Sequence, residues 1–261
     1  YNVGKMLSEA GKHYGEGIIK EYSKKLTLDI GNGYGTSNLK RMRQFYYIIE
    51  KGVAMPHLLS WSHILALLPL NNIDKINYYI KITEEQNLSY RELRNKIKNN
   101  EYERLDNSTK EKLKNEEKLQ VQDLVKNPII LKTKKEIVKE KALQQLILED
   151  MSNFLKELGN GFSYIDNEYK IKIGNNYNYI DLLLFNYIYN CFIVIELKVT
   201  ELKKEHIGQI ETYMNYIDKN LKTINQDKTI GIIITKKDNK FIMEYCSDKR
   251  ILNTTYELQG V

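Results

Sequence analysis

The sequence predicts an α/β protein overall, in which an all-α N-terminal domain precedes an α/β domain with a central mixed sheet. Three observations support this prediction. Apolar residues recur at helical spacing through residues 1–104, whereas strand-like segments begin after Gly161. Residues 105–135 are dense in Lys, Glu and Asn and contain almost no aromatic side chains. We therefore expect a helical domain over 1–104, a charged linker with some helix over 105–135, and a second domain over 136–261.

The N-terminal domain is expected to consist of short amphipathic helices. One expected helix runs from residue 15 to residue 28, and the glycine-rich turn DIGNGYG at 29–35 follows it. The next begins at an N-cap, Thr36 or Ser37, and ends near Glu50. Further helices are expected at 60–68, 72–86 and 89–100, and a capping box formed by Ser89 and Glu92 begins the last of them.

One face of the helix at 36–50 carries polar side chains suited to DNA contact. The residues Lys40, Arg43, Gln44 and Tyr47 recur at intervals of three or four, so they project from one face of the helix. Arg41 follows Lys40 directly and is assigned to the same contacts. This face resembles the recognition helix of a helix-turn-helix domain, which enters the major groove while neighbouring basic residues contact phosphates. Residues 1–104 also contain sixteen basic and eleven acidic side chains. The competing interpretations are a solvated helix face, or a surface for a protein partner or a homodimer.

The C-terminal domain is expected to alternate helices and strands. An amphipathic helix runs from about residue 136 to Leu158 and stops at Gly159. Strand-like segments follow at 162–173, 178–187 and 190–199, and their separations are short enough for hairpins. A helix at 203–221 and strands at 229–236 and 240–246 complete the expected order.

Composition excludes several classes of protein. The longest apolar run, near residues 64–70, has about seven residues against the roughly 20 that a membrane helix needs, so no membrane association is expected. Two cysteines and four histidines form no C-x-x-C or H-x-x-x-H pair, which excludes disulfide scaffolds and zinc folds. The default location is therefore a reducing compartment, the cytoplasm. The net charge of +6 comes from a Lys excess, which alone is weak evidence for nucleic acid.

Three ionisable residues lie in strands that otherwise consist of core residues: Asp181, Glu196 and Lys198. Burying such groups costs several kcal/mol unless they are paired or bind an ion. Because side chains alternate along a strand, Glu196 and Lys198 share a side, and the carbonyl of Leu197 lies between them. With Asp181 on the neighbouring strand, two carboxylates and one carbonyl can converge on a hard cation such as Mg²⁺. The Lys198 ammonium would then lie near an attacking water.

The Glu-x-Lys triplet carries no weight alone, because 23 Glu and 34 Lys in 261 residues give about three such triplets by chance. Its context is uncommon: an aspartate in the preceding apolar strand, a position at the end of a buried strand, and flanking helices in the right order. The competing interpretation is a plain buried ion pair between an acid and Lys198.

Segments of both domains resemble a known family. In the first domain these are YNVGK (1–5), LKRMRQFY (39–46), LSWSH (59–63) and SYRELRNKIKNNEYERL (89–105). In the second they are FLKELGNGF (154–162), YIDLLLF (179–185), VIELK (194–198) and GQIETY (208–213). In this order they resemble the YhcG-type nucleases of the PD-(D/E)XK superfamily, from bacteria and phages. The resemblance implies a restriction-endonuclease-like second domain whose motif falls on Asp181, Glu196 and Lys198, with Gln209 as an auxiliary catalytic residue.

The expected function is thus that of a metal-dependent endonuclease acting on DNA, with Mg²⁺ as cofactor and Mn²⁺ able to replace it. The alternative is a non-catalytic DNA-binding or assembly module that keeps the fold. Two positions depart from the family pattern: Gln144 stands where relatives show Glu, and Glu168 stands where they show Gln. Glu149 lies about 140° around the helix from Gln144. We therefore expect one Mg²⁺, held by Asp181, Glu196 and the Leu197 carbonyl.

Overall fold

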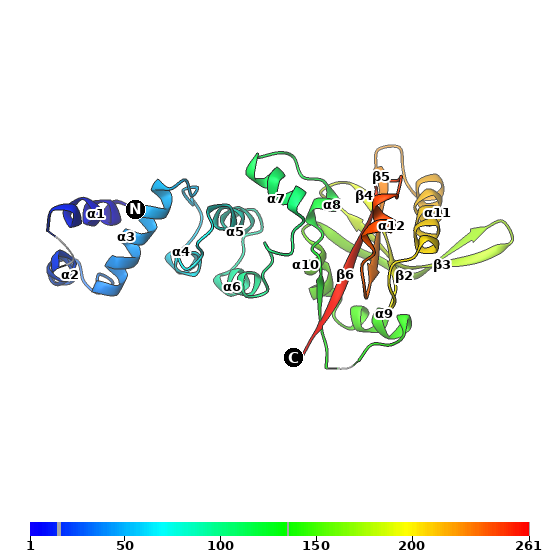
Figure 1. The fold of residues 1–261 in the computed structure, drawn as a ribbon, viewed down its shortest axis with the longest axis horizontal. Helices are drawn as coiled ribbons and strands as arrows, with labels where there is room; N and C mark the ends of the chain where they lie inside the picture. The colour runs from blue at the N-terminus through cyan, green and yellow to red at the C-terminus, as the bar shows by residue number, and fades with distance from the viewer. Residues whose placement is uncertain (15–16, 135, 261) are drawn as a thin grey trace. The chain divides into compact units, whose positions relative to one another are not determined.

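The computed structural model describes residues 1–14, 17–134 and 136–260. Within these residues the chain forms two compact units, Tyr1–Tyr102 and Glu103–Val261 (Figure 1). Each unit has its own helices and core, so each is described by itself. The expected boundaries at 15, 135 and 261 fall outside the described residues.

In the described part of the first unit, helices joined by loops are the regular secondary structure. Its helices are α1 (Asn2–Tyr14), α2 (Gly17–Asp29), α3 (Thr36–Glu50), α4 (Trp61–Leu67), α5 (Ile73–Glu85) and α6 (Tyr90–Lys98). The capping box of α6 is present, since Ser89 Oγ accepts from the Glu92 N–H at 3.3 Å and Glu92 Oε2 accepts from the Ser89 N–H at 2.9 Å. The expected side-chain cap of α3 is wrong: Gly35 is the N-cap residue and makes no side-chain cap.

Close packing of α1 on α3 depends on a glycine. A Cβ placed on Gly4 would lie 2.1 Å from the backbone oxygen of Met42, far inside van der Waals contact. Together with α2, the two helices enclose a small core whose buried members are Leu7, Ile19 and Leu39. The sequence pattern therefore fixes the helices, whereas the missing side chain lets α1 approach α3.

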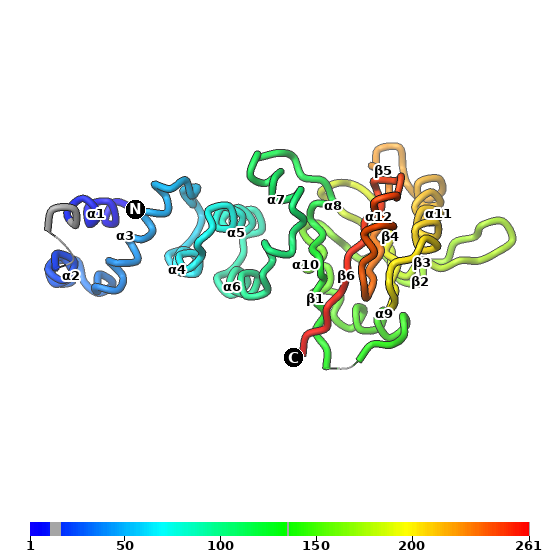
Figure 2. The backbone as a smooth tube through the Cα atoms, viewed as in Figure 1, coloured from blue at the N-terminus to red at the C-terminus, as the bar shows by residue number. Residues whose placement is uncertain are grey.

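Residues 105–134, the described part of the expected charged linker with some helix, contain a strand as well as helices. They form α7 (Asn107–Lys114), α8 (Val121–Leu124) and β1 (Ile129–Lys132). Strand β1 pairs in parallel with β6 (Ile251–Gln259) at the edge of the sheet, as Figure 2 shows for the green and red segments. Ile129 is fully buried and Leu131 is 5% exposed. The apolar run Ile129–Leu131 thus gains burial by joining the sheet, although the residues around it are charged.

The second unit is built on a six-stranded mixed sheet with the order β1-β6-β5-β4-β3-β2. The other elements are α9 (Glu140–Glu149), α10 (Met151–Leu158), β2 (Phe162–Ile173), β3 (Asn176–Asn186), β4 (Cys191–Leu197), α11 (Lys204–Asn220), β5 (Asp227–Thr235) and α12 (Lys240–Glu244). Strands β2, β3 and β4 are antiparallel neighbours, while β4, β5, β6 and β1 are parallel. The predicted mixed sheet and α/β class are confirmed.

Helices cover both faces of this sheet. One core joins Leu143, Ile147, Phe154 and Leu158 of α9 and α10 to one face, and a second core joins Ile210, Met214 and Ile217 of α11 to the other. Figure 1 shows α10 and α11 on opposite sides of the sheet. Strand β4 (CFIVIEL) is buried along its whole length because it lies in the centre of the sheet.

Two sequence expectations for this unit are wrong. The single helix at 136–158 is divided at Asp150, where α9 ends and α10 begins one residue later. The expected strand at 240–246 is the short helix α12, and the last strand is β6 instead. Short apolar runs fit either secondary structure. Here Phe241 and Tyr245 are 76% and 83% exposed, whereas Ile242 and Met243 pack against the core that α11 covers.

Candidate active site

The site lies where strands β3 and β4 diverge and stop pairing. The β3–β4 ladder runs from Leu182 and Ile195 to the hairpin end, so Asp181 is the first β3 residue outside it. The Leu197 N–H instead donates to Asp181 Oδ2 at 2.7 Å. The N–H and C=O of one strand residue face the same neighbour, so the Leu197 carbonyl also faces β3. The Asp181 carboxylate and the Leu197 carbonyl, which are expected to share a metal ion, therefore both lie along the edge of β4 that faces β3.

Glu196 and Lys198 form the buried centre of the site. Glu196 is 2% exposed and Lys198 is 9% exposed, and Lys198 Nζ lies 2.8 Å from Glu196 Oε1. Glu196 Oε2 is buried and has no hydrogen-bond partner among the described residues. Burial, followed by the negative charge of Asp181, raises the pKa of Glu196 to about 7. The ion pair thus satisfies one carboxylate oxygen and leaves the other unsatisfied.

Helix α9 contributes an acid that the sequence analysis missed. Glu140 Oε2 lies 3.4 Å from Lys198 Nζ. One turn later, Gln144 is 7% exposed and its Nε2 donates to the backbone oxygen of Asp181 at 2.9 Å. Glu149 is exposed, and its Oε1 accepts a hydrogen bond from Gln145 Nε2 at 3.4 Å. The available signal was the i, i+4 spacing, which puts Glu140 and Gln144 on one face of the helix.

Helix α11 covers the same site from its own side of the sheet. Gln209 is half-buried, and its Nε2 donates to Tyr213 Oη at 3.1 Å. Burial raises the pKa of Tyr213, and the charges of Glu196 and Asp181 act in the same direction. His206 is buried, and its Nδ1 accepts from the Lys203 N–H at 3.1 Å. Burial, and then the charge of Lys198, lowers the pKa of His206.

The site contains more negative than positive charge. Burial raises the pKa of Asp181, and the charges of Glu140 and Glu168 raise it further. For Lys198, burial lowers the pKa, but the surrounding carboxylates outweigh burial and raise it overall. One ammonium therefore faces several acids. A cation beside Glu196 Oε2 would give that oxygen a partner and would also neutralise the excess negative charge.

The donor types fit a hard cation. Two carboxylates, Asp181 and Glu196, and the Leu197 carbonyl are oxygen ligands of the kind that Mg²⁺ prefers. Within the described residues, no three His, Cys, Asp or Glu side chains form a cluster able to hold a metal ion. A Mg²⁺ ion at this site would accordingly need the backbone carbonyl in addition to the two acids.

The residues expected to contact nucleic acid all lie on α3, in the first unit: Lys40, Arg41, Arg43, Gln44 and Tyr47. Lys40 and Arg41 are exposed and Arg43 is half-buried. Gln44 Nε2 donates to the backbone oxygen of Leu68 at 3.0 Å, and Tyr47 Oη accepts from Ser8 Oγ at 3.1 Å. Two members of the expected face are therefore engaged within the unit.

The fold and the site define a restriction-endonuclease-like protein, and comparison with known families agrees. The family described as YhcG PDDEXK nuclease domain matches residues 122–259, and the chain belongs to this nuclease family. Residues 1–104 match the DUF1016 N-terminal domain. The protein described as "Putative nuclease YhcG" of Escherichia coli (strain K12) is 24% identical over 293 residues, which cover 97% of this chain and 75% of that protein.

Two solved structures are similar to part of the chain. A repair endonuclease from Pyrococcus abyssi has 15% sequence identity and a TM-score of 0.32, over 49% of this chain and 50% of that one. EndoMS in a complex with double-stranded DNA has 17% identity and a TM-score of 0.32, over 49% and 48%. The chain thus spans about half the length of each. In the described part of the chain, every helix is too short or too polar to cross a membrane.

Proposed function

We propose that this protein is a Mg²⁺-dependent endonuclease that hydrolyses phosphodiester bonds of DNA, with a DNA-binding N-terminal unit. The observation that carries the proposal is the buried, unpartnered Glu196 Oε2 beside Lys198, in a site with an excess of carboxylates. A buried charge left half satisfied is costly and is expected where a ligand completes it. Membership of the nuclease family supports the same chemistry.

Asp181, Glu196 and the Leu197 carbonyl are the groups that would hold Mg²⁺, and Mn²⁺ would fit the same oxygens. When bound, such an ion lowers the pKa of a coordinated water and neutralises charge on the phosphate. Lys198 donates to the attacking water and adds positive charge where negative charge develops. Gln144 fixes the β3 backbone at Asp181, and the Leu197 N–H orients the Asp181 carboxylate. These two contacts align the acids before substrate arrives.

Lys40, Arg41 and Arg43 are the residues of α3 that we assign to phosphate contacts of the N-terminal unit. The basic charge of residues 1–104 supports this role. Gln44 and Tyr47 would need to exchange their present partners to reach a base.

A second candidate is a non-catalytic nucleic-acid-binding module. The observation that favours it is the 2.8 Å ion pair between Lys198 and Glu196, which neutralises both groups without a metal. The two candidates differ in one measurable property: only the first converts labelled DNA into shorter products in a manner that a chelator blocks.

The test is a cleavage assay of the purified full chain on circular and linear DNA and on RNA, with Mg²⁺ and with chelator. Asp181→Ala and Lys198→Ala should remove cleavage while circular dichroism shows an intact fold. Glu149→Gln is the matched control, because it neutralises an exposed acid of α9 and should leave the rate within a few-fold. Wild-type rates in either alanine variant would contradict the assignment, and a folded wild-type chain that cuts none of the substrates would favour the non-catalytic module.

A further inference from the structure

The hairpin of β2 and β3 extends beyond the rest of the sheet. Residues 169–173 of β2 pair with 176–180 of β3, while β3 pairs with β4 only from Leu182 onward. Residues 169–180 thus form a two-stranded arm, and no third strand of the described residues pairs with it. Figure 1 shows this arm projecting past α11.

The two faces of the arm differ. Ile171 and Ile180 are 1% and 0% exposed and belong to the core that α11 covers. The cross-strand pairs Lys170–Tyr179 and Lys172–Tyr177 occupy the other face, where side chains of paired residues lie together. All four residues of this outward face are exposed, with Tyr177 and Tyr179 at 56% and 51%.

The outward face is positively charged and partly ordered. Between residues 169 and 180 the sequence has two lysines and no acidic residue. Lys170 Nζ lies 3.9 Å from the centroid of the Tyr177 ring, and Lys172 Nζ lies 5.9 Å from it. The Tyr177 ring thereby holds both ammonium groups on the solvent side of the arm, at little further entropic cost when they bind an anion.

The arm begins at the candidate active site. Tyr179 precedes Asp181 by two residues along β3, a rise of about 7 Å. A substrate strand whose phosphate reaches Asp181 and Lys198 therefore has the outward face within the reach of its neighbouring nucleotides. Positive charge combined with an exposed aromatic ring is the combination by which proteins bind single-stranded nucleic acid.

We propose that the outward face of the arm binds the nucleic-acid strand beside the scissile phosphate. Lys170 and Lys172, held by Tyr177, contact backbone phosphates, and Tyr179 stacks on an unpaired base. This proposal rests on the nuclease function proposed above, and it adds a substrate class: DNA with unpaired nucleotides next to the cleavage site, such as a fork or an overhang.

Binding is measured by fluorescence anisotropy with the full chain in chelator, so that no cleavage occurs. The probes are a labelled duplex and the same duplex with a single-stranded extension. Lys170→Ala combined with Lys172→Ala should reduce the slope of log Kd against log salt by about one to two for both probes, because two phosphate contacts are lost. Tyr179→Ala should weaken binding of the extended probe about tenfold and leave the plain duplex within about twofold.

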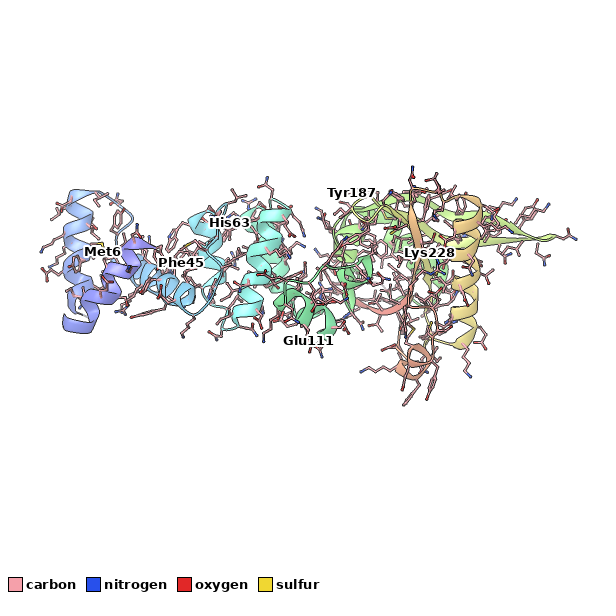
Figure 3. All side chains as sticks on the ribbon, turned by 90° about the horizontal axis from the view of Figure 1, so that it is seen from above. Met6, Phe45, His63, Glu111, Tyr187 and Lys228 are labelled. Carbon is pink, nitrogen blue, oxygen red and sulfur yellow. The ribbon has the colours of Figure 1, made fainter. Side chains whose placement is uncertain are left out.

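The matched control is Lys219→Ala combined with Lys228→Ala, which removes the same charge. Lys219 is in the last turn of α11, and Lys228, labelled in Figure 3, is near the start of β5. The carboxyl ends of the parallel strands β4 and β5 lie at the active-site edge, so the control pair lies at the opposite end of the sheet. The control should keep the wild-type salt slope within about half a unit.

The outcomes separate the arm from the catalytic proposal. Arm variants that bind like wild type, while wild type cleaves, overturn the arm and leave the nuclease function standing. Arm variants that lose binding, while wild type binds and does not cleave, support the arm and overturn the catalytic proposal. A wild-type chain that binds neither probe overturns both. Arm variants that change the sedimentation of the protein without changing DNA binding would show a surface for a second copy, which also overturns the proposal.

Discussion

Replacing Glu196 by Gln should make the stability of the protein less dependent on pH. Burial raises the pKa of Glu196 from 4.5 to about 7, so between these values the folded chain keeps a proton that the unfolded chain has released. Each pH unit then lowers the free energy of unfolding by about 1.4 kcal/mol. Over the whole shift the loss is on the order of 3 kcal/mol. This stability is fully present below about pH 4.5 and is lost as the pH rises through about 7.

The assay is urea unfolding of wild type and Glu196→Gln in chelator, from about pH 5 to about pH 8. Far-UV circular dichroism follows both units, while fluorescence of Trp61, the sole tryptophan of the sequence, follows the N-terminal unit. The variant should gain stability relative to wild type as the pH rises, by about 3 kcal/mol in total. Mg²⁺ added at the upper pH should stabilise wild type and leave the variant unchanged, because a ligand stabilises only the state that binds it.

Glu149→Gln serves as the control, since Glu149 is exposed and should show the wild-type pH dependence. A difference between wild type and Glu196→Gln that stays constant over the pH range would refute the reasoning. It would mean that Lys198 fully compensates the buried carboxylate and that the unpartnered oxygen has no energetic consequence.

Three further predictions follow from other parts of the molecule. Glu140→Gln should weaken activation by Mg²⁺ several-fold in a metal titration of cleavage, whereas Glu149→Gln should not, because Glu140 contacts Lys198 and Glu149 is bonded to Gln145 instead. Lys40→Ala combined with Arg43→Ala should flatten the salt dependence of duplex DNA binding by one to two units, and an unchanged slope would argue against phosphate contacts on α3. Gly4→Ala should lower the stability of the first unit by roughly 1–3 kcal/mol in Trp61 fluorescence, since its Cβ would meet a backbone oxygen of α3.

Local pattern was sufficient for many elements of the fold. The expected strand at 162–173 matches β2, and the expected helix at 203–221 differs from α11 by one residue at each end. The spacing of Glu196 and Lys198 also predicted that they share a side of the strand, because strand alternation is a local property, and the structure pairs them there. By contrast, α12 and β1 were mispredicted, since the secondary structure of a short apolar run depends on which neighbours bury it.

The sequence by itself determined the α/β class, the helical character of residues 1–104, and the acids and lysine that the family motif contains. Only the tertiary structure decided how these groups are satisfied. The packing of α9 on the sheet places Glu140 beside Lys198. Because β3 and β4 diverge at this point, the Leu197 N–H donates to the Asp181 side chain and not to the β3 backbone. Both contacts join residues far apart in sequence, so no local periodicity encodes them. Whether a buried oxygen such as Glu196 Oε2 has a partner depends on all the elements packed around it.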